Sequence, residues 1–429
     1  MVSAQVCFAV LLASFASAAS ASTPVSILFQ QCWHERPFTT VNLQTSHDRE
    51  LVFATRLNYF ATLPPRLSRQ DRVKELNYGP WSYPPVCTKV LQSVGDKLCV
   101  YTNTSFSGGR GISLFTTPRI AEEIATLPPF QDPDALKSKD VNVFSDNWHT
   151  QEIPGKGVGM LAKKQLKFKD RVTAYTPALV AYLEGELETL EREKFFRIAL
   201  SQLPEATRQA YLGLTYIYGL EQIRVQDIVK ANTFQLEVAG QNHLSVFPET
   251  SRLNHACAPN AQYYLDPALL THFVHATRPI APGEEITISY ISPLEPTEAR
   301  QQQLSSGFHF TCTCARCTAA DATDSKLREM QNLQKSLNDW SAESTGSPKV
   351  AEKLLQLYRK EGLEGFLDIP YGFAALAYNA VGDTKKAVKY AELAKELILM
   401  KDGPWTPNLQ IWEEMLRGPK DHWSYKRRR

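Results

Sequence analysis

The sequence lacks two features that would assign it to a simple functional class: an excess of one charge, and a long apolar segment beyond its N-terminus. Lys and Arg number 47 against 45 Asp and Glu, which leaves a formal charge of +2. A chain so balanced is not held mainly by phosphate backbones, so we expect no direct nucleic-acid binding. No segment after the leader is apolar enough for a helix that crosses a bilayer, so we expect no transmembrane segment.

The overall composition is that of a soluble globular protein, with 43% hydrophobic and 21% charged residues. At 429 residues the chain is too long for one ordinary core, so two or three domains are expected. The only concentrated charge is the basic run at residues 426–429, for which we expect a solvated, mobile terminus.

The first 21 residues have the pattern of a secretory signal peptide. An apolar stretch at residues 6–13 precedes two Ala-Ser-Ala triplets, each of which offers a small-residue cleavage site. The leader has no Lys or Arg before the apolar stretch, which departs from the usual signal pattern. This leader predicts entry into the secretory pathway or secretion. The alternative, if the leader is not a signal, is a nuclear or cytoplasmic protein.

The eight cysteines form two sets apart from Cys7 in the leader. In the first set, Cys32, Cys87 and Cys99, an oxidising compartment favours a disulfide, and Cys87–Cys99 would close a short loop. Three thiols are an odd number, so the complete pairing stays open. The second set, Cys257, Cys312, Cys314 and Cys317, is discussed below.

Three regions follow the leader. Residues 25–145 alternate short apolar runs, at 97–101 and 111–115, with turn clusters, so a mixed or β-leaning domain is expected. Residues 150–318 combine strand patterns at 171–175, 272–276 and 286–290 with two helical stretches, one opened by Pro177 and one running from Pro204 to about Tyr218.

Residues 319–429 are predicted to form a helical domain. The expected helices span residues 326–340, 348–360, 371–380, 384–400 and 408–416. Small residues on both sides of Gly382-Asp383 allow two antiparallel helices to pack closely, which resembles a tetratricopeptide hairpin, although only one such unit is legible.

The second cysteine set has the spacing of a metal site. Cys312, Cys314 and Cys317 place three sulfurs within one tight turn, and Cys257 can complete a tetrahedral zinc site from a distance. A zinc ion held by four cysteines is structural, because no coordination position remains for water. The alternative for the same residues is a reactive or disulfide-bonded cluster.

Four motifs occur in a fixed order across residues 151–318. Residues 155–159 read Gly-Lys-Gly-Val-Gly, and residues 252–260 read Arg-Leu-Asn-His-Ala-Cys-Ala-Pro-Asn. Residues 283–290 read Gly-Glu-Glu-Ile-Thr-Ile-Ser-Tyr, and the cysteine triplet follows. The combination resembles the SET-domain family of protein-lysine methyltransferases, which has an opening Gly-x-Gly, an Asn-His-Ser-Cys-x-Pro-Asn segment, a Gly-Glu-Glu strand ending in tyrosine, and a post-SET triplet. SET–MYND-type and fungal SET proteins are the most similar, although the MYND zinc module is absent between Gly159 and Asn254.

The resemblance implies an α+β fold: a SET-type β-fold with a pseudoknot and a helical insert, a post-SET zinc site, and a helical, tetratricopeptide-like C-terminal domain. It implies S-adenosyl-L-methionine-dependent methyl transfer to a lysine of a protein substrate. Cofactor contacts would come from Lys156, Gly157, Asn254, His255 (main chain and side chain) and Phe310, and zinc ligands from Cys257, Cys312, Cys314 and Cys317. Tyr290 would be the catalytic residue, because a positioned hydroxyl orients the amine for an in-line displacement.

Three positions depart from the family pattern. Ala256 replaces the usual serine, Val158 stands where some SET–MYND relatives have arginine, and Phe308 occupies a place where relatives often have tyrosine. Loss of that last hydroxyl would change how many methyl groups are added, or impair activity. The leader also supports a second hypothesis, a non-catalytic SET-fold interaction module in the secretory pathway, because oxidising conditions threaten a thiolate zinc site.

Overall fold

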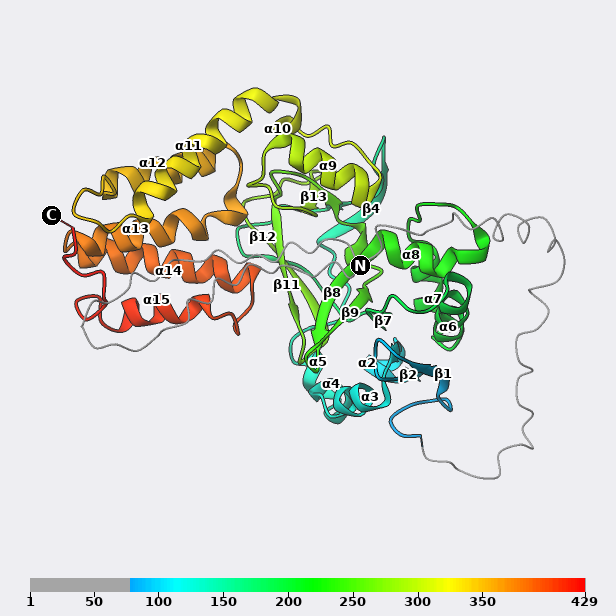
Figure 1. Ribbon diagram of the computed structural model, residues 1–429. Coiled ribbons are helices and arrows are strands. Elements are labelled where there is room, and N and C mark those ends of the chain that lie inside the picture. Colours follow the sequence, from blue (N-terminus) through cyan, green and yellow to red (C-terminus); the bar gives the residue numbers. More distant parts are fainter. Residues whose placement is uncertain (1–77, 429) are drawn as a thin grey trace, which may run out of the picture.

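Three β-sheets and three groups of helices make up the structure, a computed structural model that describes residues 78–428 (Figure 1). The sheets lie in the middle of the molecule, with α6–α8 (residues 189–232) on one side, the C-terminal helices on the opposite side and the short helices α2–α5 (residues 106–137) at the bottom of the view (Figure 1). The mixed α+β class expected from the sequence is confirmed. The predicted signal peptide, residues 1–21, and Cys32 lie outside the described residues.

The largest sheet joins strands from two distant parts of the chain. Its order is β1-β2-β3-β7-β9-β8, in which β3 and β7 are parallel and the other neighbours antiparallel. The strands are β1 Val86–Leu91, β2 Asp96–Asn103, β3 Ile112–Thr116, β7 Leu179–Tyr182, β8 Thr233–Val238 and β9 Gln241–Val246. The predicted boundary between residues 25–145 and 150–318 therefore falls between strands that share one sheet.

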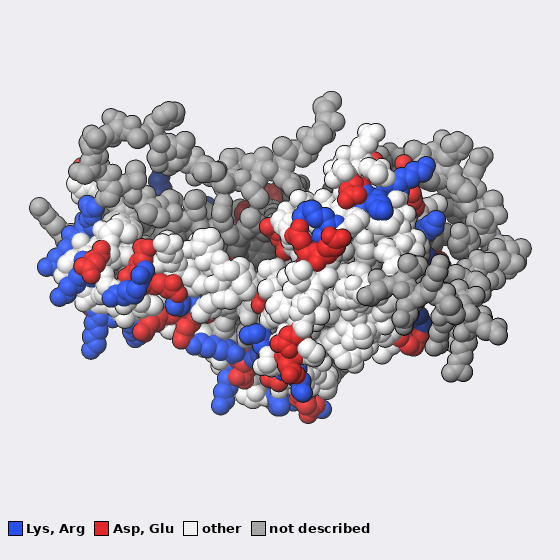
Figure 2. Space-filling view, turned by 90° about the horizontal axis from the view of Figure 1, so that it is seen from below, with Lys and Arg blue, Asp and Glu red and all other residues white. Residues whose placement is uncertain are grey.

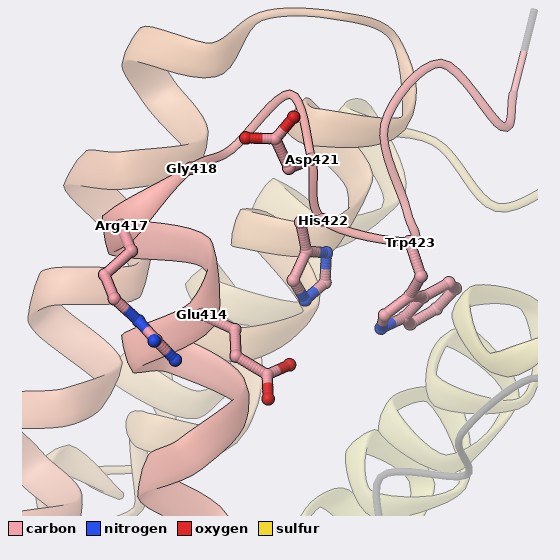
Figure 3. Close-up of a pocket in the computed structure, with 6 residues that line it drawn as sticks. All are labelled: Glu414, Arg417, Gly418, Asp421, His422 and Trp423. Carbon is pink, nitrogen blue, oxygen red and sulfur yellow. The ribbon is translucent and has the colours of Figure 1, made fainter.

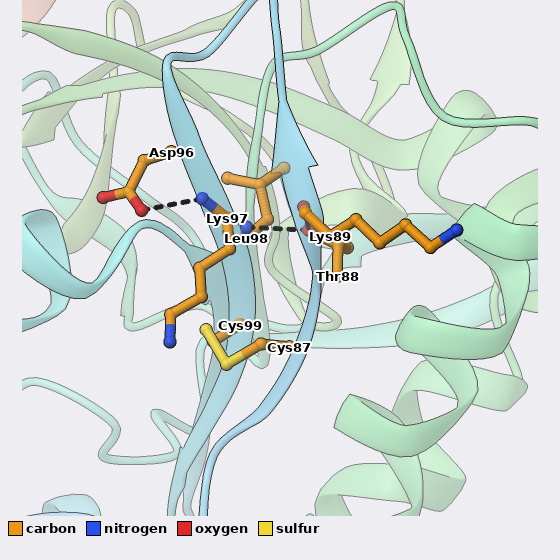
Figure 4. Close-up of a disulfide and its surroundings, with 7 residues drawn as sticks. All are labelled: Cys87, Thr88, Lys89, Asp96, Lys97, Leu98 and Cys99. Atoms are coloured by element: carbon orange, nitrogen blue, oxygen red, sulfur yellow. Dashed lines mark hydrogen bonds between the residues drawn. A yellow bond between two sulfur atoms is a disulfide. The ribbon is translucent and has the colours of Figure 1, made fainter.

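A disulfide links the first two strands of this sheet. Cys87 and Cys99 face each other in the β1–β2 register and are covalently bonded (Figure 4). Beside them, Leu98 N donates to Thr88 Oγ1 at 3.0 Å, which holds β1 onto β2 where the register shifts (Figure 4). The pairing expected from the short loop is confirmed.

The two smaller sheets hold the motif-bearing strands. The four-stranded sheet has the order β10-β13-β5-β4, and the three-stranded sheet the order β11-β12-β6. Their strands are β4 Trp148–Ile153, β5 Gly157–Ala162, β6 Arg171–Tyr175, β10 Asn254–His255, β11 Ala261–Asp266, β12 Thr271–Ala276 and β13 Glu285–Ile288. The strands predicted at residues 171–175, 272–276 and 286–290 correspond to β6, β12 and β13.

Helices bury both faces of the six-stranded sheet. Alternate β2 residues point to opposite sides: Leu98 and Val100 join one core and Cys99 and Tyr101 the other. The first core includes residues of the insert helices α6 Thr189–Ser201, α7 Glu205–Leu212 and α8 Arg224–Asn232. The short η1 Glu221–Ile223 directly precedes α8. The second includes residues of the short helices α2 Phe106–Gly109, α3 Pro118–Ala125, α4 Pro128–Gln131 and α5 Asp134–Lys137.

The structure corrects both helix predictions for the insert. Residues 179–182, which follow Pro177, form strand β7, and the helix begins only at Thr189. The apolar run is a strand because Leu179, Val180 and Ala181 are buried in the middle of the sheet. The second predicted helix ends at Leu212 rather than near Tyr218.

The C-terminal region is helical, as predicted (yellow to red in Figure 1). The short η2 Thr250–Arg252 lies just before β10. The helices after β13 are α9 Thr297–Phe308, α10 Ala315–Thr318, α11 Ala320–Asn338, α12 Pro348–Lys360, η3 Glu364–Phe366, α13 Asp368–Ala380, α14 Thr384–Lys401 and α15 Asn408–Arg417. Every residue of α13 is buried, and Ala387 and Ala391 of α14 are buried too. Small side chains there let the two antiparallel helices approach closely.

The chain end is anchored, which corrects the expected solvated terminus for Arg428. Its guanidinium lies 4.1 Å from the Trp340 ring centroid and donates to the Leu337 and Asp339 carbonyls at 2.7 Å each. A shallow hollow between the end of α15 and the following segment is lined by Glu414, Arg417, Gly418, Asp421, His422 and Trp423 (Figure 3). It lies in the C-terminal helical region, away from the motif-bearing strands.

The surface shows no separation of charge on the face in Figure 2, where Lys and Arg lie among Asp and Glu. Within residues 78–428, none of the helices combines the length and the apolar character that a membrane crossing requires.

Candidate functional site

Two of the sequence motifs meet in one parallel strand pair. Asn254 and His255 form β10, which pairs with Thr287 and Ile288 of β13. The loop after β10 is held to the same strand by Asn260, whose Oδ1 accepts from Thr287 N at 2.8 Å and whose Nδ2 donates to the Glu285 carbonyl at 2.8 Å. The two motifs, about thirty residues apart in sequence, therefore build one rigid unit.

The glycine motif forms the turn between β4 and β5. Gly157 has φ +71°, and apart from its chain neighbours no atom of residues 78–428 lies within 4 Å of where its Cβ would be, so its backbone is open to a ligand on this side. Gly159 has the opposite role. A Cβ there would meet Ile153 Cδ1 at 2.3 Å and Asn254 Nδ2 at 2.7 Å, so the absence of a side chain at Gly159 makes room for the Ile153 and Asn254 side chains.

Glu285 connects two of the predicted cofactor residues. Its carboxylate accepts from Lys156 Nζ at 2.6 Å and from Asn254 Nδ2 at 2.9 Å. The sequence reasoning assigned no role to Glu285, although it is the second glutamate of the Gly-Glu-Glu motif. In this structure the Lys156 and Asn254 side chains are thus held in place by one carboxylate at the edge of the site.

His255 is a neutral bridge inside the site. Burial lowers its pKa to about 4, so the ring is uncharged at neutral pH. Its Nδ1 accepts from Tyr290 N at 3.0 Å, which leaves the ring proton on Nε2, 3.3 Å from Cys257 Sγ. Both ring nitrogens are engaged within the protein, so the main chain of His255 is the part left for the predicted cofactor contact.

Tyr290 lies at the centre of an aromatic group just after β13. Its hydroxyl donates to the Leu253 carbonyl at 2.6 Å, and its ring stacks on Phe308 at 4.9 Å between centroids. Phe310 lies edge-on at 6.4 Å and is 36% exposed. A tyrosine hydroxyl that donates can also accept, so Tyr290 is able to receive a hydrogen bond from an amine.

The four cysteines of the second set converge. Their sulfurs all lie within 4.8 Å of one another, and Cys257 Sγ is 3.6 Å from Cys317 Sγ. A tetrahedral zinc ion with Zn–S bonds of about 2.3 Å requires sulfurs about 3.8 Å apart. The cysteines are free thiols, which excludes the disulfide-bonded alternative.

The thiols perturb one another strongly. Hydrogen bonds to Cys312 and Cys314, with burial, raise the pKa of the Cys257 thiol, while hydrogen bonds from Cys257 and Cys312 lower the pKa of Cys314. Four thiolates cannot crowd together without a cation, since each like charge opposes the next. The spacing, the burial and the donor type therefore fit a structural zinc ion.

Comparison with known proteins identifies one domain. Residues 157–291 match the family model described as SET domain. This part of the chain is therefore a SET domain, and the curated relatives that match it are named as lysine methyltransferases. The match begins at Gly157, directly after Lys156, and ends one residue after Tyr290. Phe310 and the cysteine triplet lie beyond the match and are brought to it by folding.

Curated relatives are lysine methyltransferases by name. The human protein N-lysine methyltransferase SMYD2 is 30% identical over 196 residues, which cover 45% of this chain and 44% of that protein. The chicken SMYD2 is 28% identical over 221 residues, 51% of this chain and 49% of that protein. The histone-lysine N-methyltransferase set5 of Schizosaccharomyces pombe is 26% identical over 284 residues, 63% of this chain and 83% of that protein. The chain thus spans about half the length of the SMYD2 relatives.

Proposed function

We propose that this SET-domain protein transfers a methyl group from S-adenosyl-L-methionine to a lysine side chain of a protein substrate. The observation that carries the proposal is the Tyr290 hydroxyl, held by the Leu253 carbonyl beside the Phe308 and Phe310 rings. The SET-domain match and the printed names of SMYD2 and set5 support the same reaction.

The cofactor would lie between the glycine turn and the aromatic group. Gly157 offers open backbone, and the half-exposed Phe310 ring, 6.1 Å from the His255 ring, offers a flat apolar surface for an adenine. Lys156 and Asn254, oriented by Glu285, would supply polar contacts at the edge. S-adenosyl-L-methionine supplies an electrophilic methyl group on a positively charged sulfur.

Tyr290 would orient the substrate amine. Its proton is directed to the Leu253 carbonyl, so the lone pairs of its oxygen are directed elsewhere and can accept an N–H of the amine. An in-line displacement depends on such alignment more than on a strong base. The neighbouring Phe308 and Phe310 rings favour the neutral amine, which is the nucleophilic form, because an apolar environment destabilises an ammonium ion.

Zinc would hold the segment that carries Phe310 against the SET domain. Cys257 belongs to the loop after β10, and Cys312, Cys314 and Cys317 belong to the segment that follows Phe310. His255 of β10 lies against Cys257 Sγ and accepts from Tyr290 N, so it connects this loop to Tyr290. We therefore assign the four cysteines a structural role in shaping the cofactor site.

Substitution of Tyr290 by phenylalanine tests the proposal. We expect kcat to fall by roughly 10²- to 10³-fold, the usual cost of removing one transition-state hydrogen bond, with cofactor affinity by calorimetry unchanged. Tyr182→Phe is the matched control, because that hydroxyl bonds Gln241 Oε1 in the six-stranded sheet. Undiminished methyl transfer to a protein substrate by the Tyr290→Phe variant would remove Tyr290 from the mechanism.

The second candidate is a non-catalytic SET-fold module in the secretory pathway. The Cys87–Cys99 disulfide favours it, because such bonds persist in oxidising compartments. Expression of the chain with a C-terminal tag separates the two candidates. Tagged protein in the medium that shows no calorimetric binding of S-adenosyl-L-methionine would support the module, whereas a nuclear or cytoplasmic enzyme that binds the cofactor would exclude it.

A further inference from the structure

Arg300 of helix α9 is a fully buried guanidinium beside the cysteine cluster. It is 0% exposed, and its Nη2 lies 4.0 Å from Cys317 Sγ. Its other partners are neutral: Nη1 donates to the Glu295 carbonyl at 2.7 Å and Nη2 to Thr297 Oγ1 at 2.8 Å. Nε has no hydrogen-bond partner, and within residues 78–428 no carboxylate pairs with Arg300.

A guanidinium in this position requires a negative charge nearby. Arginine stays protonated in proteins, so it cannot avoid the cost of burial by losing its charge. Hydrogen bonds to neutral carbonyl and hydroxyl groups recover less free energy than a guanidinium loses when it leaves water. Buried charges are therefore found paired with an opposite charge or next to metal complexes. Among the groups that Arg300 contacts directly, only the Cys317 sulfur can carry a negative charge. The Asp324 carboxylate is linked to Arg300 only through Thr297 Oγ1, which donates to it at 2.8 Å.

Arg316 lies on the cluster as well. It is 5% exposed, and its Nη1 donates to the carbonyls of Cys257 and Pro293 at 2.8 Å each. Its Nε pairs with Glu361 at 3.3 Å, but that carboxylate also receives Lys326 Nζ at 2.6 Å. Lys326 offsets Glu361, and the Asp324 carboxylate reaches Arg300 only through Thr297 Oγ1. Arg300 and Arg316 therefore both place positive charge beside the cysteines.

We propose that Arg300 and Arg316 are the buried counter-charges of a tetrathiolate zinc complex, with Arg300 facing Cys317. Four thiolates around a divalent zinc ion carry a net charge of −2, which the two guanidinium groups neutralise. Protonated thiols or disulfides carry no charge and would leave both arginines uncompensated. The inference rests on the zinc site of the proposed function and adds that Arg300 sets how tightly the metal is held.

Replacement of Arg300 by methionine, which keeps an unbranched apolar stem and removes the charge, tests this. The equilibrium constant for zinc transfer from the purified full-length variant to a chromogenic chelator should be about 10- to 100-fold larger than for wild type. This is the usual range for residues that support metal ligands. Arg300→Lys, which keeps the charge, should recover a large part of the loss. Arg192→Met is the control: that buried arginine pairs with Glu184 at 2.5 Å in the insert, and its loss should leave zinc retention unchanged.

Thermal unfolding, measured for the zinc-loaded protein and for the reduced, metal-free protein, distinguishes a counter-charge from an arginine that only stabilises the fold. An arginine of the second kind would change both melting temperatures equally. The Arg300→Met variant should melt lower than wild type with zinc, but no lower without it, because the uncompensated charge is gone. Equal lowering of both melting temperatures would overturn the inference, as would unchanged zinc retention. A wild-type protein that binds no zinc would overturn the zinc site itself, which distinguishes the two failures.

Discussion

The bridge formed by His255 can be broken one hydrogen bond at a time. His255 is 5% exposed, its Nδ1 accepts from Tyr290 N, and its Nε2 lies against Cys257 Sγ. Leucine has a similar volume and makes neither bond. Asparagine places its amide oxygen near the Nδ1 position, and glutamine places its amide NH2 near the Nε2 position. His255→Leu therefore removes both bonds. His255→Asn removes only the bond to the sulfur, and His255→Gln removes only the bond from Tyr290 N.

The expected magnitudes follow from these contacts. An unpaired Tyr290 N–H in a largely buried site costs about 1–3 kcal/mol of unfolding free energy. A hydrogen bond to a charged sulfur contributes about 1.5–3 kcal/mol. Because every 1.4 kcal/mol is about tenfold in an equilibrium constant, the sulfur bond corresponds to roughly 10- to 100-fold in zinc retention. For His255→Leu we expect a total loss of about 2.5–6 kcal/mol in the zinc-loaded protein.

Two measurements separate the contributions. Urea unfolding of the zinc-loaded protein reports the total, and zinc transfer to a chelator reports the sulfur bond. His255→Asn should lose zinc as readily as His255→Leu while keeping more stability. His255→Gln should keep zinc but position Tyr290 poorly, so its methyl transfer should fall without loss of metal. If the leucine variant retained zinc like wild type, the hydrogen bond to Cys257 would have no energetic role.

Two further predictions concern regions outside the site. Burial lowers the pKa of His272 to about 3, below its ordinary value near 6.5, so the folded protein loses stability as the pH falls from 6.5 toward 3. His272→Leu should reduce that loss by about 1.4 kcal/mol per pH unit, measured by urea unfolding between pH 6 and pH 4; an unchanged slope would contradict it. Cys87→Ser should cost about 3 kcal/mol through loss of the Cys99 bond, and thermal unfolding should show no difference from wild type under full reduction.

Local patterns were sufficient for the C-terminal helices and several strands. The helix expected at residues 348–360 is α12 Pro348–Lys360, and the strand expected at 171–175 is β6 Arg171–Tyr175. The helix has its boundary residue, Pro348, within the segment, and the strand has its alternation of polar and apolar residues within the segment. Helix and turn signals of this kind depend on neighbours a few residues away, which a single sequence contains.

The failures occurred where pairing is remote. Residues 179–182 are a strand only because β3, more than sixty residues earlier, pairs with them in parallel, and no local period distinguishes a buried strand from a buried helix turn. Arg428 was expected in solvent, yet Trp340 and two carbonyls hold it. The basic run contains no sign of those distant partners.

The sequence by itself determined the chemistry that is available: a glycine turn, an Asn-His-x-Cys segment, a strand ending in Tyr290, and a cysteine triplet, in the order of a SET domain. The tertiary structure decided how they act together. It brought Cys257 to the triplet, placed His255 between Tyr290 and that sulfur, and buried Arg300 beside Cys317. The residue types are written along the chain, whereas burial and charge compensation depend on which distant groups share a volume from which water is excluded.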